Sequence, residues 1–179
     1  MKKILAISGS TRKNSTNRLL INAIAEIMEG YFTILPYEGI SLLPHFNPDQ
    51  SSDAGFEVND FRKQIRKSDA IMICTPEYAH GVPGSLKNAI DWTVGTSDFS
   101  GKIVMLITAS SDGKFGHSSM LEILKVIEAV VPPEIQLLIP FAKTKIHQNG
   151  VITDSRTKAD VKAALNTLYE KLSESYAEK

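Results

Sequence analysis

Cysteine is almost absent from this chain: Cys74 is the only one among 179 residues. An intramolecular disulfide is therefore impossible. A phosphatase-type nucleophilic cysteine would need an arginine in a short loop behind it, and residues 75–80 contain none. Because Cys74 ends an apolar run, we interpret it as a small buried hydrophobic residue near the end of a strand.

The chain also lacks an excess of charge of either sign, with 20 Lys and Arg against 20 Asp and Glu. Proteins that bind nucleic acid or a membrane surface through general electrostatics carry a large positive excess, so neither partner is expected. Long hydrophobic runs are missing as well. The apolar residues 4–7 end at Ser8 and Gly9, far short of a signal sequence or of the about 20 residues that span a bilayer. A cytoplasmic protein fits this pattern best.

Short apolar runs alternate with segments of helical periodicity, and no internal repeat is present. The length matches about one domain, so we expect residues 1–179 to form a single one. The predicted strands are Lys3–Ser8, Tyr31–Tyr37, Ala70–Thr75, Lys102–Ala109 and Glu134–Phe141. The predicted helices carry stripes that should face a core, and they contain Leu19–Met28, Gly55–Lys67 (with Phe56, Phe61 and Ile65), Gly84–Trp92, Met120–Ile127 and Val161–Leu172.

Strands that alternate with helices predict right-handed βαβ crossovers and a parallel sheet covered on both faces. Residues 70–75 and 102–109 are nearly continuously apolar, as central parallel strands are. Ligands of such sheets bind beyond the carboxyl ends of the strands, where the strand order reverses. The loops behind the first, third and fourth strands should therefore carry the function. Residues 41–54 are polar, and we place them on the surface.

The loop behind the first strand, residues 9–17, reads GSTRKNSTN. Hydroxyl groups, backbone N–H groups, cations and a helix N-terminus converge there, which favours an anion such as a phosphate monoester. The loop is neither a Walker A motif, because the Gly-Lys-Ser/Thr is missing, nor the three-glycine dinucleotide fingerprint. A helix cap made by Ser15 or Thr16 alone would also explain this composition.

Residues 75–92 follow the third strand and read TPEYAHGVPGSLKNAIDW. Prolines and glycines fix this segment, so its backbone N–H groups can be held toward a flat polar ligand, with the rings of Tyr78 and His80 nearby. A rigid turn before a short amphipathic helix, with Trp92 buried or at an interface, is the other interpretation.

The two motifs together resemble those of the NAD(P)H-dependent FMN reductase family, which includes azoreductase-, quinone reductase- and chromate reductase-like enzymes. They are Gly-Ser-x-Arg-x-x-Ser-x-Asn in residues 9–17 and Pro-Glu-Tyr…Pro-Gly-x-Leu-Lys-Asn-Ala-Ile-Asp-Trp in residues 76–92. The resemblance covers the chain from residue 1 to about residue 141. It implies an α/β fold, a flavodoxin-like three-layer sandwich whose five-stranded parallel sheet has the order 2-1-3-4-5.

The resemblance also implies a set of site residues. The FMN phosphate would be held by Ser10, Arg12, Ser15, Thr16 and Asn17, and the isoalloxazine ring would be bordered by Pro76, Glu77, Tyr78, Ala79, Ser110 and Gly113. His80, Lys114 and His117 are candidates for the substrate pocket. No metal site is expected, because no pair of the four histidines has helical ligand spacing.

Two departures from the family pattern stand out. Ala79 and His80 occupy positions where the family usually has an asparagine and a small polar residue, so side-chain contacts at position 79 are lost and backbone contacts are left. Residues 116–120 read GHSSM where the family commonly has paired glycines and an arginine. The contacts of that arginine to a nucleotide or to another subunit would then be missing.

The function implied by the resemblance is an FMN-dependent oxidoreductase that takes hydride from NAD(P)H and reduces quinones, azo compounds or similar electrophiles in ping-pong fashion. A homodimer or homotetramer is implied too, with Trp92, Phe99 and residues 120–131 as candidate contacts. Two other interpretations stay open. One is a flavodoxin-type electron carrier, which the zero net charge disfavours because such carriers tend to be acidic. The other is a flavin-free scaffold on the same fold.

Overall fold

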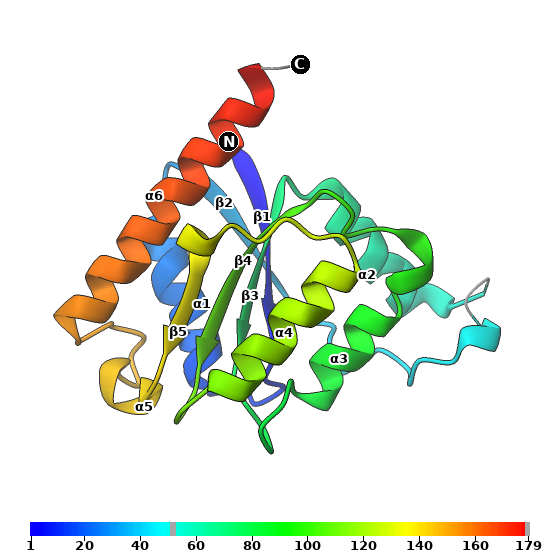
Figure 1. Ribbon diagram of the computed structural model, residues 1–179, viewed down its shortest axis with the longest axis horizontal. Coiled ribbons are helices and arrows are strands. Elements are labelled where there is room, and N and C mark those ends of the chain that lie inside the picture. The colour runs from blue at the N-terminus through cyan, green and yellow to red at the C-terminus, as the bar shows by residue number, and fades with distance from the viewer. Residues whose placement is uncertain (51–52, 178–179) are drawn as a thin grey trace.

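A computed structural model of the chain describes residues 1–50 and 53–177 (Figure 1). Five parallel strands form one sheet in the order β2-β1-β3-β4-β5, which confirms the predicted fold. The strands are β1 (Lys2–Ser8), β2 (Phe32–Tyr37), β3 (Ala70–Thr75), β4 (Ile103–Ala109) and β5 (Gln136–Ile139). The strand order reverses at β1 and β3, so a crevice is expected beyond the carboxyl ends of these two strands.

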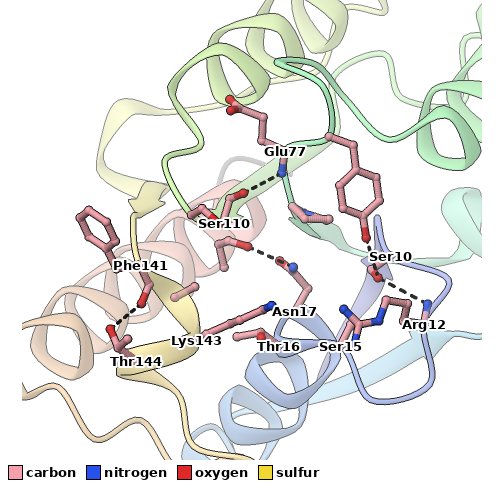
Figure 2. Close-up of a pocket in the computed structure, with 15 residues that line it drawn as sticks. Ser10, Arg12, Ser15, Thr16, Asn17, Glu77, Ser110, Phe141, Lys143 and Thr144 are labelled. Carbon is pink, nitrogen blue, oxygen red and sulfur yellow. Dashed lines mark hydrogen bonds between the residues drawn. The ribbon is translucent and has the colours of Figure 1, made fainter.

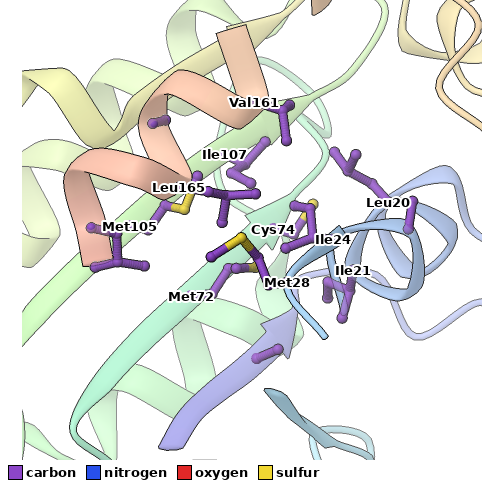
Figure 3. Packing of buried hydrophobic residues seen from close by; sticks show 14 of the residues in the cluster. Leu20, Ile21, Ile24, Met28, Met72, Cys74, Met105, Ile107, Val161 and Leu165 are labelled. Carbon is purple, nitrogen blue, oxygen red and sulfur yellow. The ribbon is translucent and has the colours of Figure 1, made fainter. Parts of the chain in front are cut away.

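Helices cover both faces of the sheet (Figure 1). α1 (Thr16–Ile27) and α6 (Ser155–Ala177) pack on one face, and α2 (Gly55–Lys67), α3 (Gly84–Asp91) and α4 (Lys114–Val126) pack on the other. Because successive strand residues point to opposite faces, the pleat divides the core into two clusters. Figure 3 shows the first cluster, where α1 and α6 close over Met72, Cys74, Met105 and Ile107. Cys74 is fully buried there, as predicted.

The last strand differs from its prediction of residues 134–141. Residues Pro133–Ile135 form a short 3₁₀ turn before β5, and Phe141 has a left-handed backbone with φ of 54° after it, so β5 is limited to Gln136–Ile139. A four-residue helix that the sequence analysis did not anticipate, α5 (Ala142–Lys145), follows directly. This sharp turn carries residues 141–144 to the carboxyl edge of the sheet.

Three aromatic residues lie elsewhere than expected. Phe56 was predicted to face the core, but it is 79% exposed in the first turn of α2, where Val58 and Phe61 fill the core instead. Trp92 and Phe99 were candidate subunit contacts, and this prediction is wrong because their exposed fractions are 0% and 1%. For Trp92 the other interpretation, a buried side chain, is confirmed.

Residues 41–50 account for the burial of Trp92. The indole N–H of Trp92 donates to the carbonyl of Pro44 at 2.8 Å, and Phe46 packs edge-on against the indole ring. The segment expected to be a polar surface loop therefore also covers part of the core, and Leu43 is buried with it. Over the two described ranges of the chain, no helix is long and apolar enough to cross a membrane.

Candidate functional site

A cavity of about 450 Å³ opens at the carboxyl edge of the sheet, where the loops behind β1, β3, β4 and β5 meet (Figure 2). It is lined by Ser10, Arg12, Ser15, Thr16, Asn17, Pro76, Glu77, Tyr78, Ala109, Ser110, Ser111, Phe141, Ala142, Lys143 and Thr144. This is the position at which open parallel sheets bind their ligands.

One end of the cavity is formed by the first turn of α1. Ser15 is the N-cap of this helix, and its Oγ accepts a hydrogen bond of 3.1 Å from the N–H of Arg18. The first N–H groups of an α-helix have no partner inside the helix, and the helix dipole adds partial positive charge there. Arg12 lines the cavity at the same end. An anion is therefore favoured at this place.

The side chain of Asn17 is used to join elements of the fold. Asn17 is only 3% exposed; its Nδ2 donates to the carbonyl of Ala109 at 3.1 Å and its Oδ1 accepts from the thiol of Cys74 at 3.2 Å. The carboxamide thus fixes the start of α1 against the ends of β3 and β4. Burial of the thiol raises the pKa of Cys74 far above its ordinary value, so this cysteine stays protonated and can donate.

The loop behind β3 is tied to its neighbours on both sides. The hydroxyl oxygens of Ser10 and Tyr78 lie 3.3 Å apart, and the N–H of Glu77 donates to Oγ of Ser110 at 3.1 Å. The Glu77 carboxylate points away from the cavity (Figure 2) and accepts a hydrogen bond of 2.6 Å from the N–H of Gly116, in the first turn of α4. Glu77 therefore contributes backbone rather than negative charge to the cavity wall.

Residues 78–81 form a two-residue hairpin turn. The N–H of Tyr78 donates to the carbonyl of Gly81 at 3.0 Å, and the N–H of Gly81 donates back at 2.9 Å. Both central residues have left-handed backbones, with φ of 48° at Ala79 and 58° at His80. This is the pattern of a type I′ turn, which favours Asn-Gly. The asparagine expected at position 79 from the resemblance thus has a conformational reason that does not involve a ligand.

Most of the predicted site residues are brought together in the cavity wall. The predicted residues that line it are Ser10, Arg12, Ser15, Thr16, Asn17, Pro76, Glu77, Tyr78 and Ser110. Those that do not are Ala79, Gly113, His80, Lys114 and His117. Gly113 instead starts α4 with φ of 94°, and a Cβ there would lie 2.9 Å from Leu138. The turn before α4 therefore requires a glycine at position 113.

The three substrate-pocket candidates do not line the cavity, and each has another contact. His80 stacks on Phe115, with ring centroids 4.6 Å apart and ring planes 8° apart. Lys114 is exposed, and its Nζ lies 3.9 Å from a carboxylate oxygen of Asp112. Nδ1 of His117 lies 2.8 Å from Oγ1 of Thr108, and burial lowers the pKa of His117 below its ordinary value.

Four lining residues from the segment behind β5 were missed by sequence reasoning: Phe141, Ala142, Lys143 and Thr144. The rule that ligands bind at the carboxyl ends of parallel strands applies to this loop as much as to the others. The sequence prediction placed function only in the loops behind the first, third and fourth strands, so residues 141–144 were not among its candidates.

The residues present fit FMN, the cofactor that the resemblance implies. A phosphate monoester suits the α1 end, with its hydroxyl groups, helix N–H groups and Arg12. The remaining wall offers hydroxyl groups and backbone for a polar chain and a flat ring, with Pro76 and Tyr78 as apolar surface.

Comparison with known proteins gives the same assignment. Residues 2–144 match the model of the NADPH-dependent FMN reductase family. The chain is 32% identical over 177 residues to an NAD(P)H:quinone oxidoreductase of Solanum tuberosum, covering 93% of this chain and 90% of that protein. It is 31% identical to a quinone reductase of Escherichia coli K12 over 164 residues, 87% of each chain.

Among solved structures, the flavoenzyme NAD(P)H:(acceptor) oxidoreductase FerB of Paracoccus denitrificans superposes with a TM-score of 0.87. The two share 26% sequence identity, and the match covers 97% of this chain and 98% of FerB. The chain therefore belongs to the NADPH-dependent FMN reductase family, oxidoreductases with FMN as cofactor and NAD(P)H as co-substrate.

Proposed function

We propose that this protein reduces quinones and related electrophiles such as azo compounds at the expense of NAD(P)H, in a ping-pong cycle in which nucleotide and acceptor occupy the same place in turn. Bound FMN supplies the ring that takes up hydride and passes the electrons on. The observation that carries the proposal is the cavity at the carboxyl edge, with an anion-binding end at α1 and an open wall of loop backbone. The names of the quinone-reducing relatives support the acceptor class.

The chain's own residues bind and orient. We assign the phosphate to Arg12, to the hydroxyl groups of Ser10, Ser15 and Thr16, and to the first N–H groups of α1. Asn17 belongs to this site through its backbone and through the hydrogen bonds that fix the helix start. The hydrogen bonds of Asn17 to Ala109 and Cys74 exist before any ligand arrives, so little ordering of the helix start is needed on binding.

The ring end is assigned to residues 76–79 and to Ser110, with Gly113 acting through the turn that it permits. Ala79 does not line the cavity, so its assigned part is the backbone of the turn that follows Tyr78. Of the substrate-pocket candidates we retain His80, whose exposed ring stacks on Phe115 next to this loop. His117 is directed to Thr108, and Lys114 is exposed to solvent near Asp112, so neither is assigned a substrate contact.

We further propose that the 179 residues act as one flavin-binding domain in the cytoplasm, where NAD(P)H is available, and assemble as a homodimer or homotetramer. With Trp92 and Phe99 buried, we assign assembly to an apolar surface between α3 and α4, where Val94, Ile123 and Val126 line a shallow groove. Light scattering on the purified protein and on Val126→Asp tests this. A monomeric wild-type protein contradicts it.

Turnover with bound flavin quantified tests the main proposal. The purified protein should carry a flavin absorption band and should oxidise NADH or NADPH in the presence of a benzoquinone and of an azo dye. Initial rates at varied nucleotide and acceptor should give parallel double-reciprocal lines, the signature of a ping-pong cycle. An electron carrier would bind FMN without consuming NAD(P)H, and a colourless protein that binds no added FMN would contradict the cofactor assignment.

A further inference from the structure

Lys143, a basic residue outside both sequence motifs, lines the same cavity. It lies on α5, behind β5, and shares the wall with Arg12, Ser15 and Thr16. In the view of Figure 2 its side chain extends from α5 toward the first turn of α1. Lys143 and Arg12 thus approach the anion-binding end from different segments of the chain.

The backbone that carries Lys143 is firmly anchored. The N–H groups of Phe141 and Ala142 donate to the carbonyls of Ser111 and Ser110, each at 3.0 Å, and Oγ1 of Thr144 donates to the carbonyl of Phe141 at 2.8 Å. The left-handed backbone of Phe141 turns the chain sharply enough for these bonds to form. Since the bonds involve the loop behind β4, α5 is held beside the cavity before any ligand is present.

The charge of the cavity wall is unbalanced. Within the described part of the chain, Arg12 and Lys143 are its basic side chains, and Glu77 is its acidic one. The Glu77 carboxylate is directed to the N–H of Gly116, away from the cavity. A phosphate monoester carries about −1.5 to −2 charge at pH 7, so Arg12 alone would leave roughly half of it uncompensated.

We propose that Lys143 is the second cation of the phosphate site, so that the FMN phosphate lies between Arg12 and Lys143. This inference rests on the FMN site proposed above and adds a residue that neither motif contains. It implies that α5 gives the protein much of its preference for FMN over riboflavin, which lacks the phosphate. Because the contact is electrostatic and partly exposed to solvent, the preference should weaken as the salt concentration rises.

A competition experiment on the FMN-loaded protein measures this preference directly. Riboflavin is added in increasing amounts, and the FMN that it displaces is quantified after ultrafiltration, which gives the ratio of the two affinities. Lys143→Met removes the charge and keeps an apolar stem. Lys145→Met is the matched control, since Lys145 lies on the same short helix but lines a different hollow with Asp154 and Arg156.

We expect Lys143→Met to lower the preference for FMN over riboflavin about tenfold, as loss of a hydrogen bond to a charged group would. Lys145→Met should leave the ratio unchanged, and Lys143→Arg should retain most of it. Lys143 is exposed, so the variant should also unfold at the wild-type temperature.

An unchanged ratio in Lys143→Met would overturn the proposal. If the KM for NADPH, but not for NADH, rose in the same variant, Lys143 would be assigned to the 2′-phosphate of the nucleotide instead. A wild-type protein that retains no FMN would instead refute the proposed function, so the two failures are distinguishable.

Discussion

The turn at Ala79 and His80 should limit the stability of this protein. Two adjacent residues with Cβ atoms have φ of 48° and 58°, a region that is disfavoured for residues other than Gly, Asn and Asp. The turn is held by the paired Tyr78–Gly81 hydrogen bonds and by the stacking of His80 on Phe115. Replacing Ala79 by Asn should relieve the first residue without touching the stack.

The expected magnitudes follow from these contacts. The left-handed conformation costs about 1–2 kcal/mol for an ordinary residue and less for asparagine, so Ala79→Asn should stabilise the fold by about 0.5–1 kcal/mol. For a protein of this size that raises the unfolding temperature by about 1–4 °C. His80→Gly relieves the second residue, but it loses a ring pair worth about 0.5–1.5 kcal/mol and adds freedom to the unfolded chain. Its net effect should be near zero or destabilising.

Urea unfolding measures the two changes. Trp92 is the only tryptophan and is fully buried, so its fluorescence reports the loss of the core. FMN must be held at one concentration throughout, because a ligand that binds only the folded state raises the apparent stability. Ala79→Val is the control that should change stability in the opposite direction, since a β-branched residue tolerates a positive φ least and should destabilise the protein. If valine left the unfolding midpoint unchanged, or if asparagine lowered it, the assignment of turn strain would be refuted.

Three further experiments probe the site and its surroundings. Arg12→Ala should weaken FMN binding by about 1.5–3 kcal/mol, because it removes a charge-assisted contact, and an unchanged FMN affinity would remove Arg12 from the phosphate site. Cys74 should resist alkylation by iodoacetamide at pH 8 in the folded protein and react in urea, because burial raises its pKa; rapid labelling of the folded protein would contradict its burial.

The third experiment measures how the stability of the protein depends on pH. Burial lowers the pKa of His117 in the folded state, so its contribution to stability is complete above the unfolded value of about 6.5 and is lost as the pH falls toward the folded value. His117→Gln should therefore lose less stability than wild type between pH 8 and pH 5, measured by thermal unfolding, and equal losses would contradict this origin.

The fold was predictable because its signal repeats along the chain. Runs such as residues 70–75 are apolar at every position, which is typical of strands covered on both faces, and they alternate with helical stripes of regular spacing. The positions of the loops then follow from the handedness of βαβ crossovers. The cavity at the carboxyl edge is a consequence of topology, and it was predicted together with most of its wall.

The errors occurred where long-range packing decides the outcome. Nothing in the local sequence shows that Pro44 accepts a hydrogen bond from the indole of Trp92, a contact 48 residues away that buries the ring. Phe56 has the right residue type for a core position, but the helix begins at Gly55 and turns it to solvent. Lys143 was missed because function was expected only of the loops behind the first, third and fourth strands, and the turn at Phe141 brings the loop behind β5 to the same cavity.

The motif residues of this chain fall into two groups with different structural roles. The hydroxyl groups and Arg12 face the cavity, whereas Asn17 and Glu77 use their side chains to join loops, Asn17 to Ala109 and Glu77 to Gly116. A motif match alone cannot separate the groups, because both occur at fixed spacing in the same segments. Their substitution should separate them: loss of the Asn17 or Glu77 side chain reduces stability and ligand affinity together, and loss of the Arg12 side chain reduces affinity alone. Ser15 belongs to both groups, because it lines the cavity and also caps α1.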